Sequence, residues 1–336
     1  MLDRTPTLPP SISPVVSPNR PMWSVMIPCY NCIKFLEYAM RSVLIQTWYR
    51  HDIQIEVVDD ASTDGDVESL VATVGKGRIS YFRNEQNIGS LRTFEVCINR
   101  SRGTLIHILH GDDGVKFGFY EEIESLFESY PDIGAAITQH SFIDTDGNET
   151  ANKNIIRNEP GIIQNWLYKI AAKPLVQPPA VVVKRSVYEQ LGGFFAVHYG
   201  EDWEMWTRIA SQYALAYSPK CLALYRGGNE ESISGRFVRD GSNFNDINRV
   251  LEIIQAYIPD NKKKEIRKLA KRNFSISYAN SAFQILKKNR NNNTAFILAK
   301  GALALDINLR TVYYIIRAIF QYFIMAAFDT MKAIKN

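Results

Sequence analysis

The sequence contains little of what marks several common classes of protein. Only four cysteines occur in 336 residues, too few for a disulfide framework, so we expect a reducing compartment. No run of 18 apolar residues is present, and the segment that comes nearest, 311–328, is interrupted by Arg317 and Gln321. The first residues carry prolines in place of the apolar run of a signal peptide. We therefore expect a cytoplasmic protein without a membrane-spanning helix.

Two phosphate-binding loops are also missing. No G-x-G-x-x-G follows the first predicted strand, and no Walker-type loop occurs. This argues against a dinucleotide-dependent oxidoreductase and against an NTPase. A nucleotide would be held through a metal ion and carboxylates instead.

Charge is unevenly distributed along the chain. Residues 260–336 hold fifteen Lys and Arg against four Asp and Glu, a net charge of +11. Residues 1–259 hold 24 against 31, a net charge of −7. An acidic body with a basic tail suggests an anionic partner for the tail. Hydrophobic residues make up 46% of the chain, which is ample for a sizeable core.

Three regions follow one another. Residues 1–21 contain six prolines and predict a disordered leader. Residues 22–235 alternate strand and helix patterns, which predicts an α/β domain with a mostly parallel, doubly wound sheet. Residues 236–336 form a predicted helical extension that carries most of the basic charge.

The pattern of apolar residues locates the elements of the α/β domain. The predicted strands are 23–27, which Pro28 ends, and 53–58, 79–83, 105–109 and 135–142. The predicted helices are 35–44, 66–74, 90–100 and 201–212. Residues 144–182 are expected to be loop-rich and to face a substrate, and two short strands are expected at 214–217 and 222–225.

Polar residues follow three of these strands, and ligands of an open parallel sheet collect beyond such strand ends. The three groups are Pro28-Cys29-Tyr30-Asn31, Asp59-Asp60-Ala61-Ser62 and Gly111-Asp112-Asp113. Adjacent carboxylates repel each other, so Asp112 and Asp113 suggest a cation such as Mg²⁺ or Mn²⁺. The same pair also fits a simple turn that caps the next helix.

Two more acidic groups allow both a structural and a functional interpretation. Asp59 and Asp60 fit a capped turn between strand and helix, or carboxylate acceptors that recognise a base and a ribose. Glu201 and Asp202 fit the dipole at a helix N-terminus, or, for one of them, a general base that takes a proton from an attacking hydroxyl.

In their order and spacing, these motifs resemble the family 2 glycosyltransferases, which have the Rossmann-like GT-A fold. The resemblance covers about residues 23–234. It rests on Val25-Met26-Ile27-Pro28-Cys29-Tyr30-Asn31, Val57-Val58-Asp59-Asp60-Ala61-Ser62-Thr63-Asp64-Gly65, Asn87-Ile88-Gly89, Gly103, His110-Gly111-Asp112-Asp113, Asp144 with Gly147, Leu191-Gly192-Gly193-Phe194, Glu201-Asp202-Trp203, Tyr225-Arg226 and Ser232-Ile233-Ser234.

The resemblance implies a role for each matching residue. Asp113 would be the metal ligand and Asp202 the catalytic base, with Glu201 and Trp203 in the acceptor region. Asp60 would recognise the base of the donor, with Asp59 beside it, and Asp112 would contact the ribose or the sugar. The remaining donor-binding residues would be Pro28, Tyr30, Asn31 and Arg92.

The implied reaction is a one-step inverting transfer from a nucleotide-diphosphate sugar, with UDP as the expected carrier and Mn²⁺ or Mg²⁺ as cofactor. His110 stands where many members have an acid, so the metal shell can differ, and packing is the expected role of His110. The Gln-x-x-Arg-Trp element of processive synthases is missing, which favours transfer of a single sugar. A cell-surface polysaccharide or a lipid-linked glycan is the implied acceptor.

Other functions fit the residues less well. Cys29 and Cys32 have the spacing of a thiol redox motif, but their chain context favours small buried residues. A sugar nucleotidyltransferase would need a Gly-rich basic loop after the first strand, and this chain has none. A nucleotide-sugar-binding protein without catalysis stays open.

The basic tail carries no nucleic-acid-binding motif. Its apolar stretch within 306–336 predicts either a core or dimer-forming helix, or a helix that lies on anionic lipid at the inner face of the membrane.

Overall fold

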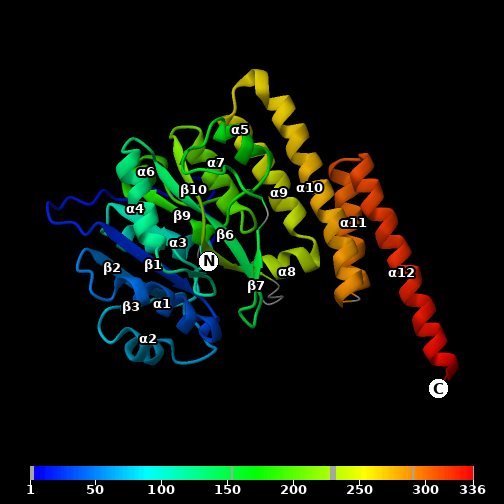
Figure 1. The fold of residues 1–336 in the computed structure, drawn as a ribbon, viewed down its shortest axis with the longest axis horizontal. Coiled ribbons are helices and arrows are strands. Elements are labelled where there is room, and N and C mark those ends of the chain that lie inside the picture. The colour runs from blue at the N-terminus through cyan, green and yellow to red at the C-terminus, as the bar shows by residue number, and fades with distance from the viewer. Residues whose placement is uncertain (1–3, 153, 228–231, 290, 336) are drawn as a thin grey trace. The chain divides into compact units, whose positions relative to one another are not determined.

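The computed structural model describes residues 4–152, 154–227, 232–289 and 291–335. They divide into two compact units (Figure 1). The first, here called the α/β unit, comprises residues 1–170 and 174–229. The second, the helical unit, comprises residues 171–173 and 230–336.

The α/β unit is built on one sheet in which ten strands are described. Their order is β3-β2-β1-β4-β9-β6-β10-β5, with β7 paired to β6 and β8 paired to β10. The strands are β1 (Trp23–Cys29), β2 (Ile53–Asp59), β3 (Ser80–Arg83), β4 (Leu105–Ile108), β5 (Gly114–Val115), β6 (Ala135–Ile143), β7 (Glu149–Ala151), β8 (Gly161–Ile162), β9 (Val181–Lys184) and β10 (Leu215–Arg226). Strands β1 to β4 pair in parallel, as do β6 and β10.

Helices connect these strands and cover the sheet. They are α1 (Ile33–Thr47), α2 (Val67–Gly75), α3 (Ser90–Arg100), α4 (Phe119–Ser129), α5 (Trp166–Ala172), the short 3₁₀ helix η1 (Pro178–Ala180), α6 (Arg185–Leu191) and α7 (Glu201–Ala210). Helix α3 packs on β1, and α4 packs on β6 and β10. Every residue of β1 is buried, as expected of a parallel strand covered on both faces. The predicted α/β fold with a mostly parallel sheet is confirmed.

Three details of the sheet differ from the pattern-based prediction. The Val-Val-Val run at the end of the expected loop-rich region is β9, which lies between β4 and β6 and pairs antiparallel with both. The two expected short strands near the end of the unit are one strand, β10, with an irregularity between Ser218 and Ala223. Pro28 lies inside β1. The strand tolerates a proline there because the pairing of β1 with β4 ends at Met26, so no ladder hydrogen bond requires an N–H at position 28.

The predicted disordered leader also differs from the structure. Residues 4–21 form neither helix nor strand, but their backbone makes hydrogen bonds to other parts of the α/β unit. Ile12 is 4% exposed, and the Pro6 and Pro10 carbonyl groups accept hydrogen bonds from Ala196 N and Gly193 N. A proline-rich segment has few N–H groups to satisfy, so it can lie extended against other elements through its carbonyls.

In the described residues of the helical unit, all the regular secondary structure is helical. They are α8 (Ile233–Asp240), α9 (Asn243–Ile253), the 3₁₀ helix η2 (Ile254–Tyr257), α10 (Asp260–Asn289), α11 (Asn292–Leu305) and α12 (Leu309–Lys335). Helix α10 packs against α11 and α12, and Ser275 Oγ lies 2.7 Å from Thr311 Oγ1 between α10 and α12. Over the described part of the chain, none of the helices is both long enough and apolar enough to cross a membrane.

The loop before β4 requires glycine at one position. A Cβ at Gly103 would lie 2.3 Å from the carbonyl carbon of Trp23 and 2.4 Å from Ser24 N, both in β1. The close approach lets Gly103 N donate to Ser24 Oγ at 2.7 Å, and so helps to fix the start of β4 against β1.

We expect Gly103→Ala to lower the free energy of unfolding by about 1–3 kcal/mol or more, because strand backbone cannot yield as a flexible side chain can. Urea unfolding of the full chain measures this. Gly227→Ala is the control, since a Cβ at this position would meet no atom within 4 Å, and it should change stability by less than about 0.5 kcal/mol. Equal effects of the two substitutions would contradict the packing described.

Candidate active site

Backbone hydrogen bonds join the three polar strand ends at one edge of the sheet. Asp60 N donates to Cys29 O at 2.8 Å, which ties the residues after β2 to β1. Gly111 N donates to Pro28 O at 3.0 Å, which ties the residues after β4 to β1 from the other side. The predicted convergence of these residues is therefore present in the fold.

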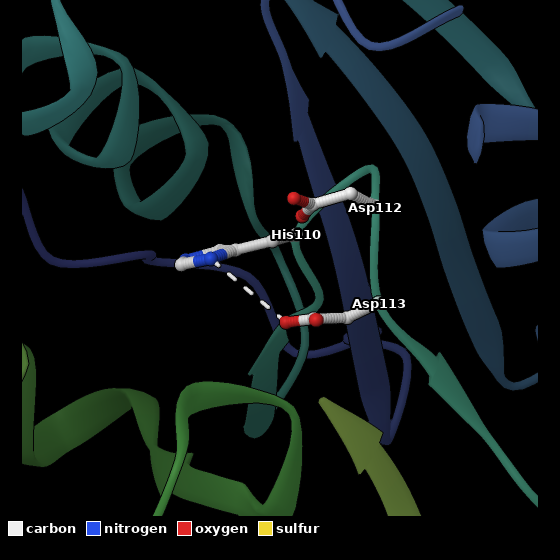
Figure 2. A group of neighbouring side chains, drawn as sticks. All are labelled: His110, Asp112 and Asp113. Atoms are coloured by element: carbon white, nitrogen blue, oxygen red, sulfur yellow. Dashed lines mark ion pairs between the residues drawn. The ribbon is translucent and has the colours of Figure 1, made fainter. Parts of the chain in front are cut away.

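His110, Asp112 and Asp113 form an acidic cluster in the turn after β4 (Figure 2). One ligand atom from each lies within 4.8 Å of the others. Asp113 is 1% exposed, and its Oδ1 accepts a hydrogen bond from Arg226 N at 2.8 Å. Its Oδ2 is buried without a hydrogen-bond partner among the described residues and lies 4.0 Å from His110 Nδ1.

Burial sets the charge state of this cluster. Burial, and then the neighbouring Asp112 carboxylate, raise the pKa of Asp113 well above its usual value. Burial lowers the pKa of His110, while Asp112 acts against that shift. A neutral imidazole has a free lone pair, and its ring stacks on Phe94 with centroids 5.2 Å apart. Three side chains that could bind a metal ion thus meet where burial and a second carboxylate disfavour the negative charge of Asp113.

Arg226, at the end of β10, holds the acidic turn in place. Its Nε donates to Asp112 O at 2.7 Å, and its Nη1 donates to Asp144 O. The guanidinium also lies 4.5 Å from the centroid of the Phe35 ring. The side chain therefore binds backbone carbonyls, and only the backbone N–H reaches the Asp113 carboxylate. The sequence pattern assigns Arg226 no role beyond its place in the Tyr225-Arg226 motif.

Asp60 lies at the predicted edge of the sheet, but its carboxylate already accepts hydrogen bonds from other groups of the protein. Its Oδ1 accepts from Asn84 Nδ2 at 2.9 Å and Ile88 N at 2.8 Å, and its Oδ2 accepts from Asn87 Nδ2 at 2.8 Å and Gly89 N at 2.9 Å. Asp60 therefore shapes the loop 84–89. No local sequence pattern indicates the pairing of Asp60 with Asn84 or Asn87, because these residues lie 24 and 27 positions away along the chain. A direct contact of Asp60 with a base stays a prediction.

Asp59 is fully buried and similarly engaged. Its carboxylate accepts from Ser62 N at 2.9 Å and from the Tyr81 hydroxyl at 2.8 Å, and it forms an ion pair with Arg83. The bond from Ser62 N closes a turn after β2, whereas the N-cap of α2 is Asp66, which accepts from Ser69 N at 2.9 Å.

The remaining predicted donor residues lie in different environments. Pro28 is buried in β1, whereas the Tyr30 side chain is 44% exposed beyond the strand end. Asn31 has a φ of 48° and accepts a hydrogen bond from Thr63 N at 2.8 Å. Arg92, in the first turn of α3, forms an ion pair with Glu95 at 2.8 Å.

A pocket is lined by one member of the acidic cluster, His110, and by the candidate base Asp202. Its lining residues are Phe94, Ile108, His110, Pro178, Val181, Tyr188, Phe194, Glu201, Asp202 and Trp206. His110 from the turn after β4 and Asp202 from the start of α7 therefore face the same space. Most of the other lining side chains are apolar.

The helical period explains which tryptophan lines this pocket. Asp202 and Trp206 are four residues apart and share a face of α7. Trp203 points elsewhere: it is 1% exposed, and its Nε1 donates to Ile170 O at 2.6 Å. The structure therefore places Trp203 in the core and puts Trp206 where the sequence predicts an acceptor-facing Trp203.

Burial raises the pKa of Asp202 to about 6, although Trp203 N donates to its Oδ1 at 2.7 Å and acts in the opposite direction. The apolar lining of the pocket accounts for the shift, since it disfavours the ionised form. A carboxylate with such a pKa is ionised at neutral pH and can still accept a proton.

Residues 24–192 match the family model for glycosyl transferase family 2. The chain belongs to glycosyltransferase family 2. The enzyme class and the family predicted from the motifs are thereby confirmed.

Relatives and solved structures agree with this assignment. An uncharacterized glycosyltransferase of Haemophilus influenzae is 25% identical over 236 residues, which cover 64% of this chain and 68% of the relative. TarS of S. aureus, solved with UDP-GlcNAc, superposes with a TM-score of 0.62 at 16% identity over 89% of both chains. The mannosyltransferase PcManGT of Pyrobaculum calidifontis, solved with GDP-Man and Mn²⁺, gives a TM-score of 0.52 at 18% identity over 95% of this chain and 90% of its own. These likenesses confirm the GT-A fold.

Replacing Asp202 by Asn should stabilise the protein at neutral pH. The folded-state pKa of about 6 lies above the ordinary value of 3.8, so ionisation of Asp202 costs stability as pH rises through that interval. Urea unfolding should show Asp202→Asn to be more stable than the wild type at about pH 7.5, with the difference reduced to about half at about pH 5 and almost gone at about pH 3.5.

The control is Asp144→Asn, for which the sign is opposite. Hydrogen bonds from the Asn148 side chain and backbone lower the pKa of Asp144, so its ionised form contributes stability at neutral pH that is lost as pH falls through the lowered pKa. Asp144→Asn should therefore be less stable than the wild type at about pH 7.5. A destabilising, pH-independent effect of Asp202→Asn would contradict the described environment of Asp202.

Proposed function

We propose that this glycosyltransferase moves a single sugar, with inversion at the anomeric carbon, from a nucleotide-diphosphate sugar to an acceptor hydroxyl. The observation that carries the proposal is the shared pocket of His110, a member of the acidic cluster, and Asp202. A ligand of the proposed cation and a base for the acceptor thus face the same space.

The α/β unit is proposed as the catalytic domain. Its donor is proposed to be UDP-linked, which is supported by the UDP and UDP-GlcNAc bound to TarS. The GDP-Man bound to PcManGT makes GDP the alternative carrier, and a screen of both classes of sugar nucleotide distinguishes the two.

The acidic cluster fits a divalent cation. Asp113 Oδ2 is a buried oxygen without a donor among the described residues, and Asp112 and His110 present further ligand atoms within 4.8 Å. The imidazole favours Mn²⁺ over Mg²⁺, which prefers oxygen ligands. When bound, such a cation would neutralise the charge that develops on the departing diphosphate.

Asp202 is proposed to accept the proton of the acceptor hydroxyl. Its pKa of about 6 keeps it ionised at neutral pH and leaves it basic enough for proton transfer. Activity should therefore fall as pH drops through about 6. The apolar side chains of Phe94, Phe194 and Trp206 line the same pocket and would exclude water from the reacting centre.

Donor recognition is proposed to use the exposed groups at the strand ends. Tyr30 offers an exposed ring for a base, Asn31 lies beside it, and Asp112 would contact the ribose or the sugar. Arg92 is proposed to reach a phosphate, and Glu201 to contact the acceptor. Asp59 and Asp60 would contribute mainly by fixing the loops beside the sugar-nucleotide donor, since their carboxylates already accept hydrogen bonds within the protein.

The helical unit is proposed to rest on an anionic membrane surface at the cytoplasmic leaflet and to bring a lipid-linked or cell-surface glycan to the enzyme. Between residues 309 and 325 of α12, the buried positions are Thr311, Ala318 and Met325, at a spacing of seven. Its exposed large apolar side chains are Leu309, Val312, Tyr313, Ile316, Ile319, Phe320, Tyr322, Phe323 and Ile324. The net charge of +11 over residues 260–336 complements anionic lipid.

Asp113→Asn should lower kcat/KM by on the order of a thousandfold, because the charge stabilisation lost with the cation amounts to several kcal/mol. A thermal-shift screen of UDP- and GDP-sugars with and without Mn²⁺ identifies the donor, and release of nucleoside diphosphate then measures turnover. The exposed acid Asp132 gives the control Asp132→Asn, which should keep wild-type activity. Full activity of Asp113→Asn would rule the metal site out, and the absence of any turnover by the wild type would favour a catalytically inactive binding protein.

Replacing Phe320 and Phe323 together by Ser should weaken binding to vesicles that contain phosphatidylglycerol, since both rings are more than half exposed. Co-sedimentation measures this, and deletion of residues 306–336 should abolish it. Phe117→Ser is the control, because its ring is 72% exposed in the α/β unit. Unchanged sedimentation of the double variant would contradict the membrane proposal, and a dimer that this variant dissociates would show that α12 binds a second copy instead.

A further inference from the structure

Residues 4–13, here called the N-terminal strap, run along the rest of the α/β unit and contact loop 84–89 and loop 192–198, the second of which contributes Phe194 to the pocket. The strap is anchored at one end by Ile12, which is 4% exposed, and by Ser13. Ser13 O accepts a hydrogen bond from Arg185 Nη2 at 2.8 Å, and Ser13 N donates to Asn99 Oδ1 at 3.2 Å. Arg185 is itself buried in α6, so the anchor rests on a fixed element.

Beyond the anchor, the strap holds the loop that precedes α7. Pro10 O accepts from Gly193 N at 2.9 Å, and Pro6 O accepts from Ala196 N at 2.8 Å. Phe194 lies between these two bonds and lines the pocket together with Asp202. The strap therefore fixes the backbone on both sides of a pocket residue.

The Gly192-Gly193 pair allows this close approach. A Cβ at Gly192, where φ is +79°, would lie 2.8 Å from Pro9 Cβ, and one at Gly193 would lie 3.1 Å from Pro10 Cγ. Contact with the strap thus gives a physical reason for two adjacent glycines in the Leu191-Gly192-Gly193-Phe194 motif of this chain.

The other end of the strap reaches the loop that Asp60 holds. Arg4 Nη2 donates to Asn87 Oδ1, and Asn87 Nδ2 in turn donates to Asp60 Oδ2 at 2.8 Å. Thr5 Oγ1 lies 2.8 Å from His198 Nε2. The strap thus joins loop 84–89, beside the proposed donor site, to loop 192–198, which leads into α7 and its Asp202.

We propose that the strap is a positioning element for sugar transfer, which holds loop 192–198 and the start of α7 in register with the donor-side loop. This inference rests on the proposed function of Asp202 as the base. Fixing the two loops against each other limits the orientations of Phe194 and Asp202, and such orientation raises the rate of a step between two bound groups. Prolines in the strap reduce the entropy lost when it is ordered.

The test compares the full chain with a variant that lacks residues 2–10 and with the milder variant Thr5→Val/Arg4→Ala. Val16→Ala is the control, because Val16 is 97% exposed just outside the strap. Turnover is measured as release of nucleoside diphosphate from UDP-GlcNAc, UDP-glucose or GDP-mannose, whichever gives the largest Mn²⁺-dependent thermal shift, with water as the acceptor. Hydrogen exchange of residues 84–89 and 192–206 is followed in parallel.

Loss of the strap should lower kcat by about tenfold while the KM for the donor stays within about twofold. Exchange should become faster in residues 192–206, and Val16→Ala should match the wild type. Unchanged kcat together with unchanged exchange in either strap variant overturns the proposal, as does a loss expressed only in the donor KM. If the wild type itself shows no Mn²⁺-dependent turnover, the proposed function fails, and the exchange data still decide whether the strap couples the two loops.

Discussion

The Asp113 carboxylate is buried beside a second carboxylate, and one of its oxygens has no donor among the described residues. Such a group is unfavourable as an anion unless positive charge lies near it. Arg226, a buried arginine at the end of β10, directs its guanidinium to the carbonyls of Asp112 and Asp144 and to the ring of Phe35. Its side chain therefore fixes the shape of the turn, and its charge acts on Asp113 without a hydrogen bond to the carboxylate.

The rest of the α/β unit supports this turn and Asp202, the proposed base. Parallel pairing of β1 with β2 and β4 places the residues after these strands at one edge. Asp59 and Asp60 stiffen that edge through bonds to Arg83 and to loop 84–89. On the other side of the pocket, apolar residues raise the pKa of Asp202. The environment of Asp113 thus fits the proposed metal ion, and the environment of Asp202 fits the proposed acceptance of a proton.

Local patterns predicted the parts of the site that depend on local chemistry. The acidic turn follows a buried strand, and Asp202 begins an amphipathic helix, so both were identifiable from their neighbours in sequence. Long-range partners were not. The bonds of Asp60 to Asn84 and Asn87, the reach of Arg226 to the turn after β4 and the contacts of the N-terminal strap depend on chain segments that only tertiary structure brings together. The antiparallel pairing of β9 with β4 and β6 joins segments far apart in the sequence, so no local pattern indicates it. The spacing of four between Asp202 and Trp206 indicates that these two residues share a face of α7.

The presence of a cation on the Asp113 turn is the central claim, and titration of the protein with Mn²⁺, followed by the electron paramagnetic resonance signal of the free ion, tests it most directly. With UDP present, the wild type should deplete the free-ion signal, and Asp113→Asn should weaken binding by at least about tenfold, because it replaces a charged ligand by a neutral one. Equal depletion by the wild type and by Asp113→Asn, or none by either, would contradict the account.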